Sequence, residues 1–440
     1  MNPCKTVKNY GRILRIFSYF LSNSYEKFFL SLMRHIDRTD SVNKTRSINY
    51  NKLIQSMSKR MFLEKSIQLK FKENDFSSQI RPKILILSSE IYDSGGHTEV
   101  ALRFIESFKG EFDIDFLLTT FTLRSEISAP VKSKIIKSCA KNYIEFDPEK
   151  TCCKKIIDLY AHVLNSKYTT IIVNIHVFDV VSCAVLGLLK EYSNINIIYW
   201  NHADHLYALG MDFANVILTR NKAGRPLTPH IKDKKNFNDF YFLEKSNETH
   251  KYTHDELNEL KKELGIPPYA LVTISGASFY KFGEGYFKLI DRILKENVNV
   301  YHIFMCSCSE KSKRFINKYV GAQNRFIRTD FSANFDKYIQ ISDIFIDSFP
   351  QGSALTLVDF IKHAKPVIIK VDEKDPIRSF ETYLHDDYAY SCKTSEEMFK
   401  KICELVCDKE KYSQISKEVR NFYEKKYNIE TVKQRYRELF

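Results

Sequence analysis

The 440-residue sequence contains no run of about 18 uncharged apolar residues, the minimum that a membrane-spanning helix needs. Its N-terminus has no small-residue cleavage site after an apolar core, so no secretory signal is expected. It contains no internal repeat and no low-complexity tract. With 44% apolar and 28% charged residues, the composition predicts a globular protein.

The ten cysteines lack the spacing of a zinc ribbon. One pair forms a CxC motif, one pair is adjacent and one pair lies a helical turn apart: Cys306 and Cys308, Cys152 and Cys153, Cys403 and Cys407. We interpret them as reduced cysteines of a cytoplasmic protein and expect no bound metal.

Basic charge is concentrated in the first 80 residues. The net charge is +13, and residues 1–80 contain 15 Lys and Arg against 6 Asp and Glu, which leaves +9 in this segment. Aromatic and leucine side chains mix with basic ones in residues 11–36, which predicts one amphipathic helix or two short ones. This extension could attach to the anionic inner face of the plasma membrane, or pack on the first domain with its basic face in solvent.

From residue 81 the pattern alternates between short apolar runs and helical segments, which predicts an α/β fold with parallel strands. We expect a first domain over 81–245, with its last strand at residues 214–219. A second domain follows over 246–420, and a C-terminal helix over 421–440. Both domains should be Rossmann-like, and such sheets bind ligands beyond the carboxyl ends of their strands.

Two segments of the second half have the composition of a phosphate site. Residues 348–353 connect a predicted strand to a helix, whose N-terminus favours an anion, and Gly352, Ser353 and Thr356 lie at that position. Earlier, a strand end leads into a helix through a turn that contains Lys281, whose charge could neutralise a diphosphate. The turn residues beside it are Gly276, Ser278 and Tyr280. An ordinary strand-to-helix connection and a surface lysine are the alternatives.

The first half offers two candidate functional motifs. GGHTEV places Gly95, Gly96 and His97 between the first strand and a helix. His97 could act as a general base kept neutral by the helix N-terminus, or it could merely cap the turn. NHADH follows a later strand and could line the cleft, bind a metal or form a structural polar network. Its polar residues are Asn201, His202, Asp204 and His205.

Residues 278–304 (SFYKFGEGYFKLIDRILKENVNVYHIF) and 345–368 (FIDSFPQGSALTLVDFIKHAKPVI) resemble the donor-site segments of O-GlcNAc transferase and of the bacterial cytoplasmic protein N-glucosyltransferases. Lys281 matches a lysine that contacts the nucleotide-sugar diphosphate in that family. Gly352, Ser353, Thr356 and Asp359 also match in position, whereas Ala354 and Leu355 replace polar residues. Residues 201–210 resemble a run found in bacterial GT-B glycosyltransferases.

The resemblance implies a GT-B fold with two Rossmann-like domains facing each other across a cleft, and no bound cofactor. It implies transfer of a hexose or N-acetylhexosamine from a nucleotide sugar, with UDP as the expected nucleotide, to a cell-surface glycan, a lipid-linked acceptor or a protein. The second domain would bind this donor and the first domain the acceptor. Asp359 would accept the ribose hydroxyls. In one retaining GT-B group two glutamates occupy the positions of Gln351 and Asp359, so their absence here argues against that group.

Three other functions are compatible with the sequence. A nucleotide-sugar 2-epimerase would share the donor site and need no separate acceptor. A nucleic-acid-binding protein would use the net positive charge, but that charge lies mostly in the extension, so no nucleic-acid partner is expected. A non-catalytic scaffold protein on a membrane would have the same fold but no enzymatic activity.

Overall fold

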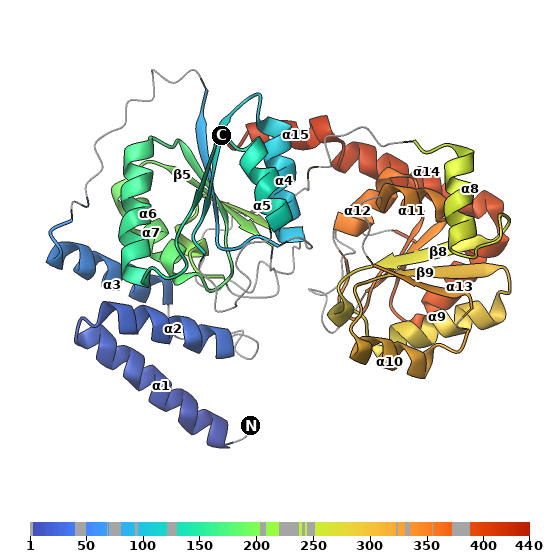
Figure 1. Ribbon diagram of the computed structural model, residues 1–440, viewed down its shortest axis with the longest axis horizontal. Coiled ribbons are helices and arrows are strands. Elements are labelled where there is room, and N and C mark those ends of the chain that lie inside the picture. Colours follow the sequence, from blue (N-terminus) through green and yellow to red (C-terminus); the bar gives the residue numbers. More distant parts are fainter. Residues whose placement is uncertain are drawn as a thin grey trace. The chain divides into compact units, whose positions relative to one another are not determined.

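A computed structural model describes residues 3–39, 50–67, 69, 81–92, 96–120, 130–202, 208–219, 237–239, 243, 251–322, 324–330, 335–353, 355–371 and 388–440. The chain forms two compact units. The first is Met1–Phe240 together with Tyr436–Phe440, and the second is Tyr241–Arg435. Each unit is built on one parallel sheet with helices on its faces (Figure 1).

The sheet of the first unit has seven strands in the order β3-β2-β1-β4-β5-β6-β7, all paired in parallel. Its strands are β1 (Lys83–Ser88), β2 (Asp113–Leu118), β3 (Asn142–Glu145), β4 (Thr170–Asn174), β5 (Asn196–Asn201), β6 (Val216–Thr219) and β7 (Phe237–Asp239). The expectation that residues 214–219 form the last strand of this half was wrong, because β7 pairs with β6. Three residues are too few to show a strand pattern in the sequence.

Helices cover both faces of this sheet (Figure 1). They are α4 (Gly96–Phe108), α5 (Pro130–Cys139), α6 (Cys152–Ser166) and α7 (Val180–Tyr192). Side-chain caps begin two of them: Thr151 accepts a hydrogen bond from the N–H of Lys154, and Asp179 accepts one from that of Ser182. Ten successive residues of α7 are buried, because this helix packs against α3 (Tyr50–Glu64) as well as α6.

The N-terminal helices pack on the first unit. They are α1 (Pro3–Leu21), α2 (Tyr25–Thr39) and α3. Phe28, Phe29 and Met57 belong to the same apolar core as the residues of α6 and α7. The backbones of α3 and α7 approach closely at Gly187, where an added Cβ would lie 3.1 Å from the side chain of Gln55. That glutamine donates a hydrogen bond to the Gly187 carbonyl at 2.7 Å.

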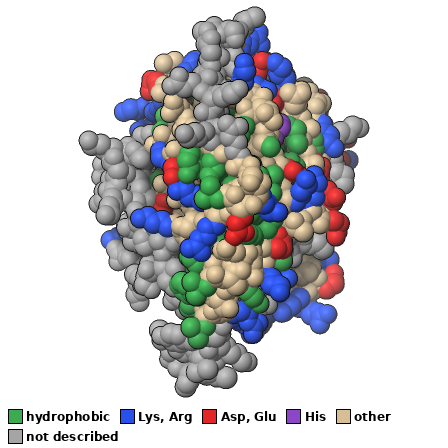
Figure 2. Space-filling model, turned by 90° about the vertical axis from the view of Figure 1, so that its left-hand side faces the viewer, with side chains coloured by type: hydrophobic (Ala, Val, Ile, Leu, Met, Phe, Trp, Pro, Cys, Tyr) green, Lys and Arg blue, Asp and Glu red, His purple; other side chains and the backbone are tan. Residues whose placement is uncertain are grey.

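One face of the N-terminal helices stays exposed. Leu14, Phe17 and Leu21 of α1 are 69%, 38% and 77% exposed, and Leu63 of α3 is 68% exposed. Figure 2 faces this side of the molecule and shows hydrophobic side chains with Lys and Arg side chains between them. No helix among the described residues is long and apolar enough to cross a membrane.

The sheet of the second unit has six strands in the order β10-β9-β8-β11-β12-β13, again parallel. Its strands are β8 (Leu271–Gly276), β9 (Val300–Met305), β10 (Phe326–Thr329), β11 (Ile344–Ile346), β12 (Val367–Lys370) and β13 (Ser391–Cys392). The helices between them are α8 (His254–Glu263), α9 (Glu284–Glu296), α10 (Glu310–Tyr319), α11 (Phe335–Ile341) and α12 (Leu355–Lys362).

Three helices end the chain: α13 (Ser395–Cys407), α14 (Lys409–Lys426) and α15 (Ile429–Arg437). The last residues belong to the first unit. There Arg437 forms a two-pronged ion pair with Glu111, at 2.8 and 2.9 Å. Tyr436 packs edge-on against Phe104 of α4, at 5.3 Å between ring centroids. Residues 436–440 therefore return to the first unit.

Candidate functional site

The two donor segments predicted from the sequence meet in the second unit. Lys281 ends a short 3-10 helix, η4 (Phe279–Lys281), that follows β8. Its ammonium group donates a hydrogen bond to the Gly352 carbonyl at 3.0 Å. The backbones also touch, since the N–H of Gly283 donates to the carbonyl of Phe349 at 2.8 Å. An added Cβ on Gly283 would lie 3.0 Å from the Pro350 ring, so this close approach favours glycine.

Asp347 organises the turn that carries Gly352. It follows β11, is 1% exposed, and its Oδ1 accepts hydrogen bonds from the N–H groups of Ser348 at 2.9 Å and Ser353 at 2.8 Å. Burial raises the pKa of this carboxyl to about 6, and the nearby charge of Lys281 acts in the opposite direction. Sequence reasoning missed its role. An acidic residue directly after a buried strand was the available signal.

The remaining donor candidates lie on the same segments. Gly276 ends β8 and is buried, whereas Ser278 is exposed and Tyr280 is 71% exposed. Thr356 and Asp359 lie one turn apart on α12, both half-buried. The carboxyl edge of the second sheet thus brings together the Lys281 ammonium group, the Gly352 carbonyl, the buried carboxyl of Asp347 and the start of α12.

In the first unit the structure brings His97 and His202 together. His97 lies in the first turn of α4 and His202 follows β5, and their rings meet edge to face with centroids 4.4 Å apart. Both ring nitrogens of His97 are buried and have no hydrogen-bond partner in the described part of the chain. Burial lowers the pKa of His97 to about 4, and His176 acts in the same direction. A neutral His97 was predicted, but burial rather than the helix N-terminus is its main cause.

The other acceptor candidates are only partly visible. Asn201 ends β5 with 2% exposure, and Gly96 begins α4. Gly95, Asp204 and His205 lie outside the described residues. No group of three or more His, Cys, Asp or Glu side chains within the described ranges is arranged to hold a metal ion, and the absence of a metal stays a prediction.

Sequence reasoning also missed a buried polar group at this edge. Glu90 follows β1 and His176 follows β4, the strand paired with β1. Nε2 of His176 lies 3.8 Å from Oε1 of Glu90. Each residue comes two positions after a buried strand, a position that does not by itself show which side chains will lie close together.

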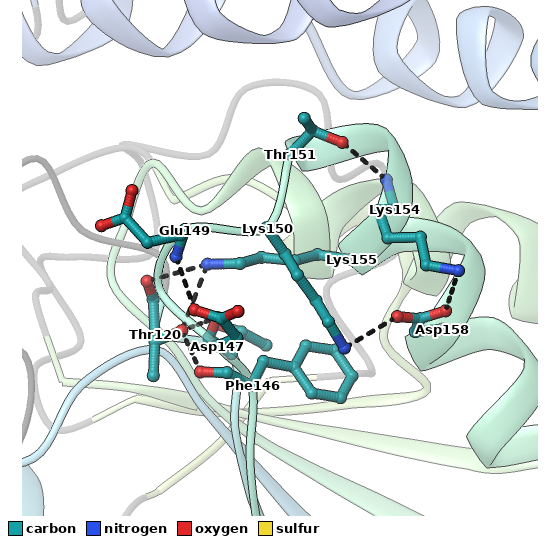
Figure 3. Close-up of polar contacts among 10 residues, drawn as sticks. Thr120, Phe146, Asp147, Glu149, Lys150, Thr151, Lys154, Lys155 and Asp158 are labelled. Atoms are coloured by element: carbon teal, nitrogen blue, oxygen red, sulfur yellow. Dashed lines mark hydrogen bonds and ion pairs between the residues drawn. The ribbon is translucent and has the colours of Figure 1, made fainter.

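A buried lysine fixes the ends of β2 and β3 at the same edge (Figure 3). Nζ of Lys155 donates hydrogen bonds to the carbonyl and hydroxyl of Thr120, at 3.2 and 3.1 Å, and to the carbonyl of Pro148 at 3.3 Å. Burial lowers the pKa of this lysine. Because three oxygens occupy its three N–H donors, Lys155 stabilises the strand ends and has no donor left for a ligand.

No protein-family model matches the sequence, and no curated protein matches it. Three solved structures with similar architecture are HepE from Anabaena with UDP and glucose, O-GlcNAc transferase from Thermobaculum terrenum, and a putative UDP-N-acetylglucosamine 2-epimerase from Listeria monocytogenes. For HepE the identity is 14% and the TM-score 0.64, over 81% of this chain and 99% of that one.

For the O-GlcNAc transferase the identity is 11% and the TM-score 0.54, over 96% of this chain and 82% of that one. For the epimerase the identity is 9% and the TM-score 0.51, over 77% of this chain and 92% of that one. Likeness at these identities defines the fold. The protein has the GT-B fold, with two Rossmann-like domains, as the sequence predicted.

Proposed function

We propose that the protein is a glycosyltransferase that moves a hexose or N-acetylhexosamine from a UDP-sugar to a cell-surface glycan, a lipid-linked acceptor or a protein. The contact between Lys281 and Gly352 carries this proposal, because it joins a cation to the start of a helix at the carboxyl edge of the second sheet. That edge is where ligands of doubly wound sheets bind. The HepE structure, which has the same fold, contains UDP and glucose.

The second unit would hold the donor. Lys281 would face the diphosphate, where negative charge grows as the bond to the sugar breaks, and a preorganised cation stabilises that charge most in the transition state. Ser353 and Thr356 would add hydroxyl donors at the helix start. Asp359, on the next turn of α12, would accept hydrogen bonds from the ribose hydroxyls.

The first unit would bind the acceptor at the carboxyl edge of its sheet. His97 and His202 meet there, and Asn201 ends β5 directly before His202. Gly95 and Gly96 precede His97 in the sequence. Proton transfer is the role predicted for His97 from the sequence. With its pKa held near 4, His97 is neutral at pH 7 and a weak proton acceptor.

A nucleotide-sugar 2-epimerase is the second candidate, because the Listeria epimerase shares this fold. Incubation with a panel of UDP- and GDP-sugars separates the two. A transferase releases nucleotide and joins the sugar to an acceptor or to water. An epimerase converts the sugar at C2.

We also propose that α1 attaches the protein to the anionic inner face of the plasma membrane. Its exposed side carries Leu14, Phe17 and Leu21, with Arg12 and Arg15 on the same helix. Apolar side chains can enter the headgroup region while arginines contact anionic lipid. The packing of α2 and α3 into the core leaves this role to the exposed side of α1.

A further inference from the structure

Two of the N-terminal helices, α2 and α3, contact the carboxyl edge of the first sheet, where His97 and His202 lie. The carboxylate of Glu26, in the first turn of α2, accepts hydrogen bonds from the backbone N–H groups of Cys152 and Cys153, at 3.0 and 2.9 Å. These two residues begin α6, which follows β3, so their N–H groups lie near the carboxyl end of that strand. A carboxylate is stabilised at a helix N-terminus, and Glu26 therefore fixes α2 at this edge.

A second contact joins α3 to the segment that contains His202. Asn51 of α3 is fully buried, and its side-chain oxygen accepts hydrogen bonds from the N–H of Gly210 at 3.0 Å and from the thiol of Cys183 at 3.3 Å. Gly210 ends the NHADHLYALG run that begins at Asn201 in β5, and Cys183 lies in the first turn of α7, which follows β4. α3 therefore supports the end of one acceptor motif.

The C-terminal half of α1 is joined to α2 and α3. Ile16 is buried and belongs to the core of the first unit. The ring of Phe20 packs against that of Phe28 on α2 with centroids 5.8 Å apart, and Cζ of Arg60 on α3 lies 4.4 Å from the centroid of the Phe20 ring. α2 lies between α1 and the first sheet (Figure 1). These contacts hold α1 on the same side of the first unit as the acceptor edge.

The exposed side of α1 suits a membrane surface. Leu14, Phe17 and Leu21 follow one another at spacings of three and four residues, so they form one exposed stripe along the helix. Arg15 is exposed beside the stripe, whereas Ile16, on another side of the helix, is buried. The headgroup region of an anionic membrane takes up apolar side chains of this kind and pairs with the cation beside them.

We propose that the acceptor is a lipid-linked molecule of the membrane to which α1 binds, and not a soluble glycan or a protein. The inference rests on the proposed glycosyl transfer and on attachment through α1. A membrane that binds α1 lies next to the carboxyl edge of the first sheet, because α2 connects the two. An acceptor anchored in that membrane by an apolar chain shares one surface with the protein, which raises its effective concentration at the edge.

The transfer to such an acceptor needs no further reactant. A hydroxyl of the acceptor's polar head loses its proton to the solvent, and its oxygen forms a bond to the anomeric carbon of the sugar. The bond from that carbon to the diphosphate breaks, and its electron pair leaves on UDP.

The test uses the full-length protein, a radiolabelled UDP-sugar from which the parent releases UDP, and membrane and cytosol fractions of the cells that produce the protein. The measurement is the division of the label among butanol-soluble lipid, precipitated protein and water-soluble material. We expect label in the butanol phase with the membrane fraction and none there with cytosol alone.

Replacing Leu14, Phe17 and Leu21 together with Ser should lower lipid labelling by about 10²-fold, because protein and acceptor no longer share one surface. Release of UDP to water without membranes should stay at the parent rate. The control is Tyr269→Ser combined with Val298→Ser, which changes side chains of the second unit that are 79% and 73% exposed. This control should label lipid as the parent does.

Label in protein or in a soluble glycan, absence of label from the butanol phase, or parent-level lipid labelling by the α1 variant would overturn the inference. UDP release by the parent would still support the donor proposal in each of these cases. Absence of UDP release from every donor would instead remove the proposed function.

The placement of the acceptor edge can be tested without turnover. Azidophenylalanine is introduced at Glu149 or at Lys109 and coupled to a fluorophore, and both positions are exposed. Glu149 lies between β3 and α6 at the carboxyl edge, whereas Lys109 follows α4 and precedes β2 at the opposite edge. Energy transfer to a dye-labelled lipid in anionic vesicles should be stronger from Glu149. Equal transfer, or stronger transfer from Lys109, would refute the placement.

Discussion

At the residue scale, Lys281 carries the donor proposal. Lys281→Ala removes the cation that would face the diphosphate. A charge-assisted contact contributes roughly 1.5–3 kcal/mol, so UDP affinity should fall about 10- to 100-fold. Titration calorimetry measures this. Lys311→Ala, which changes an exposed lysine on α10 of the same unit, should bind UDP as the parent does. Equal affinity of the Lys281 and Lys311 variants would remove Lys281 from the site.

The raised pKa of Asp347 predicts how the stability of the folded protein depends on pH. Its pKa is about 6 in the folded protein against 3.8 for an ordinary aspartate, so the folded state binds the proton more tightly than the unfolded chain. Stability from this group is present at low pH and is lost as pH rises from about 4 to about 6, by roughly 3 kcal/mol. Asp347→Asn keeps an oxygen for the two N–H groups and cannot ionise. Its melting temperature should therefore rise relative to the parent between pH 4 and pH 7, and parallel profiles would contradict this.

Residue roles were the part of the site that sequence could least predict. Lys281 and Gly352 were identifiable because a cation and a helix start follow strands in two segments that resemble one family. Asp347, Glu90 and His176 were not. Their roles depend on burial and on which strands are neighbours, and neither can be read from local sequence.

At the element scale, the exposed side of α1 can be changed without changing the core contacts of α2 and α3. Replacing Leu14, Phe17 and Leu21 together with Ser changes exposed side chains and leaves the core residue Ile16 in place. We expect the parent to co-sediment with vesicles containing anionic lipid at low salt and to dissociate at high salt, because charge screening weakens the basic contribution. The triple variant should stay in the supernatant and keep the parent's melting temperature. Binding of both proteins to the vesicles would exclude α1 as the anchor.

Helices and strands were predicted correctly where their hydrophobic pattern extends over many residues. Apolar runs predict strands at 84–87, 169–176, 195–202, 270–278 and 300–307, and helical patterns predict helices at 151–166, 178–192 and 284–296. The structure has β1, β4, β5, β8, β9, α6, α7 and α9 there, within a few residues. The short strands β7 and β13 and the helices α5 and α10 were missed. Strands of two or three residues lack a pattern, and α5 is a short helix of mixed lysine and apolar residues.

At the scale of the whole molecule, the alternation of strands and helices was sufficient to predict two parallel sheets. It was not sufficient to show that α2 and α3 belong to the first core or that residues 436–440 return to the first unit. Both are contacts between segments far apart in the sequence. The side chains that make them, such as Phe28 and Tyr436, look like those of any amphipathic helix.

We propose that this GT-B protein transfers sugar from a UDP-sugar held at Lys281. The most direct measurement is nucleotide release from a panel of UDP- and GDP-sugars, comparing the parent with Lys281→Ala and Lys311→Ala at donor concentrations below saturation. We predict that the parent and the Lys311 variant release UDP from one UDP-hexose or UDP-N-acetylhexosamine, and that the Lys281 variant does so about 10- to 100-fold more slowly. Absence of nucleotide release from every donor, or conversion of the sugar at C2 without release, would contradict the claim.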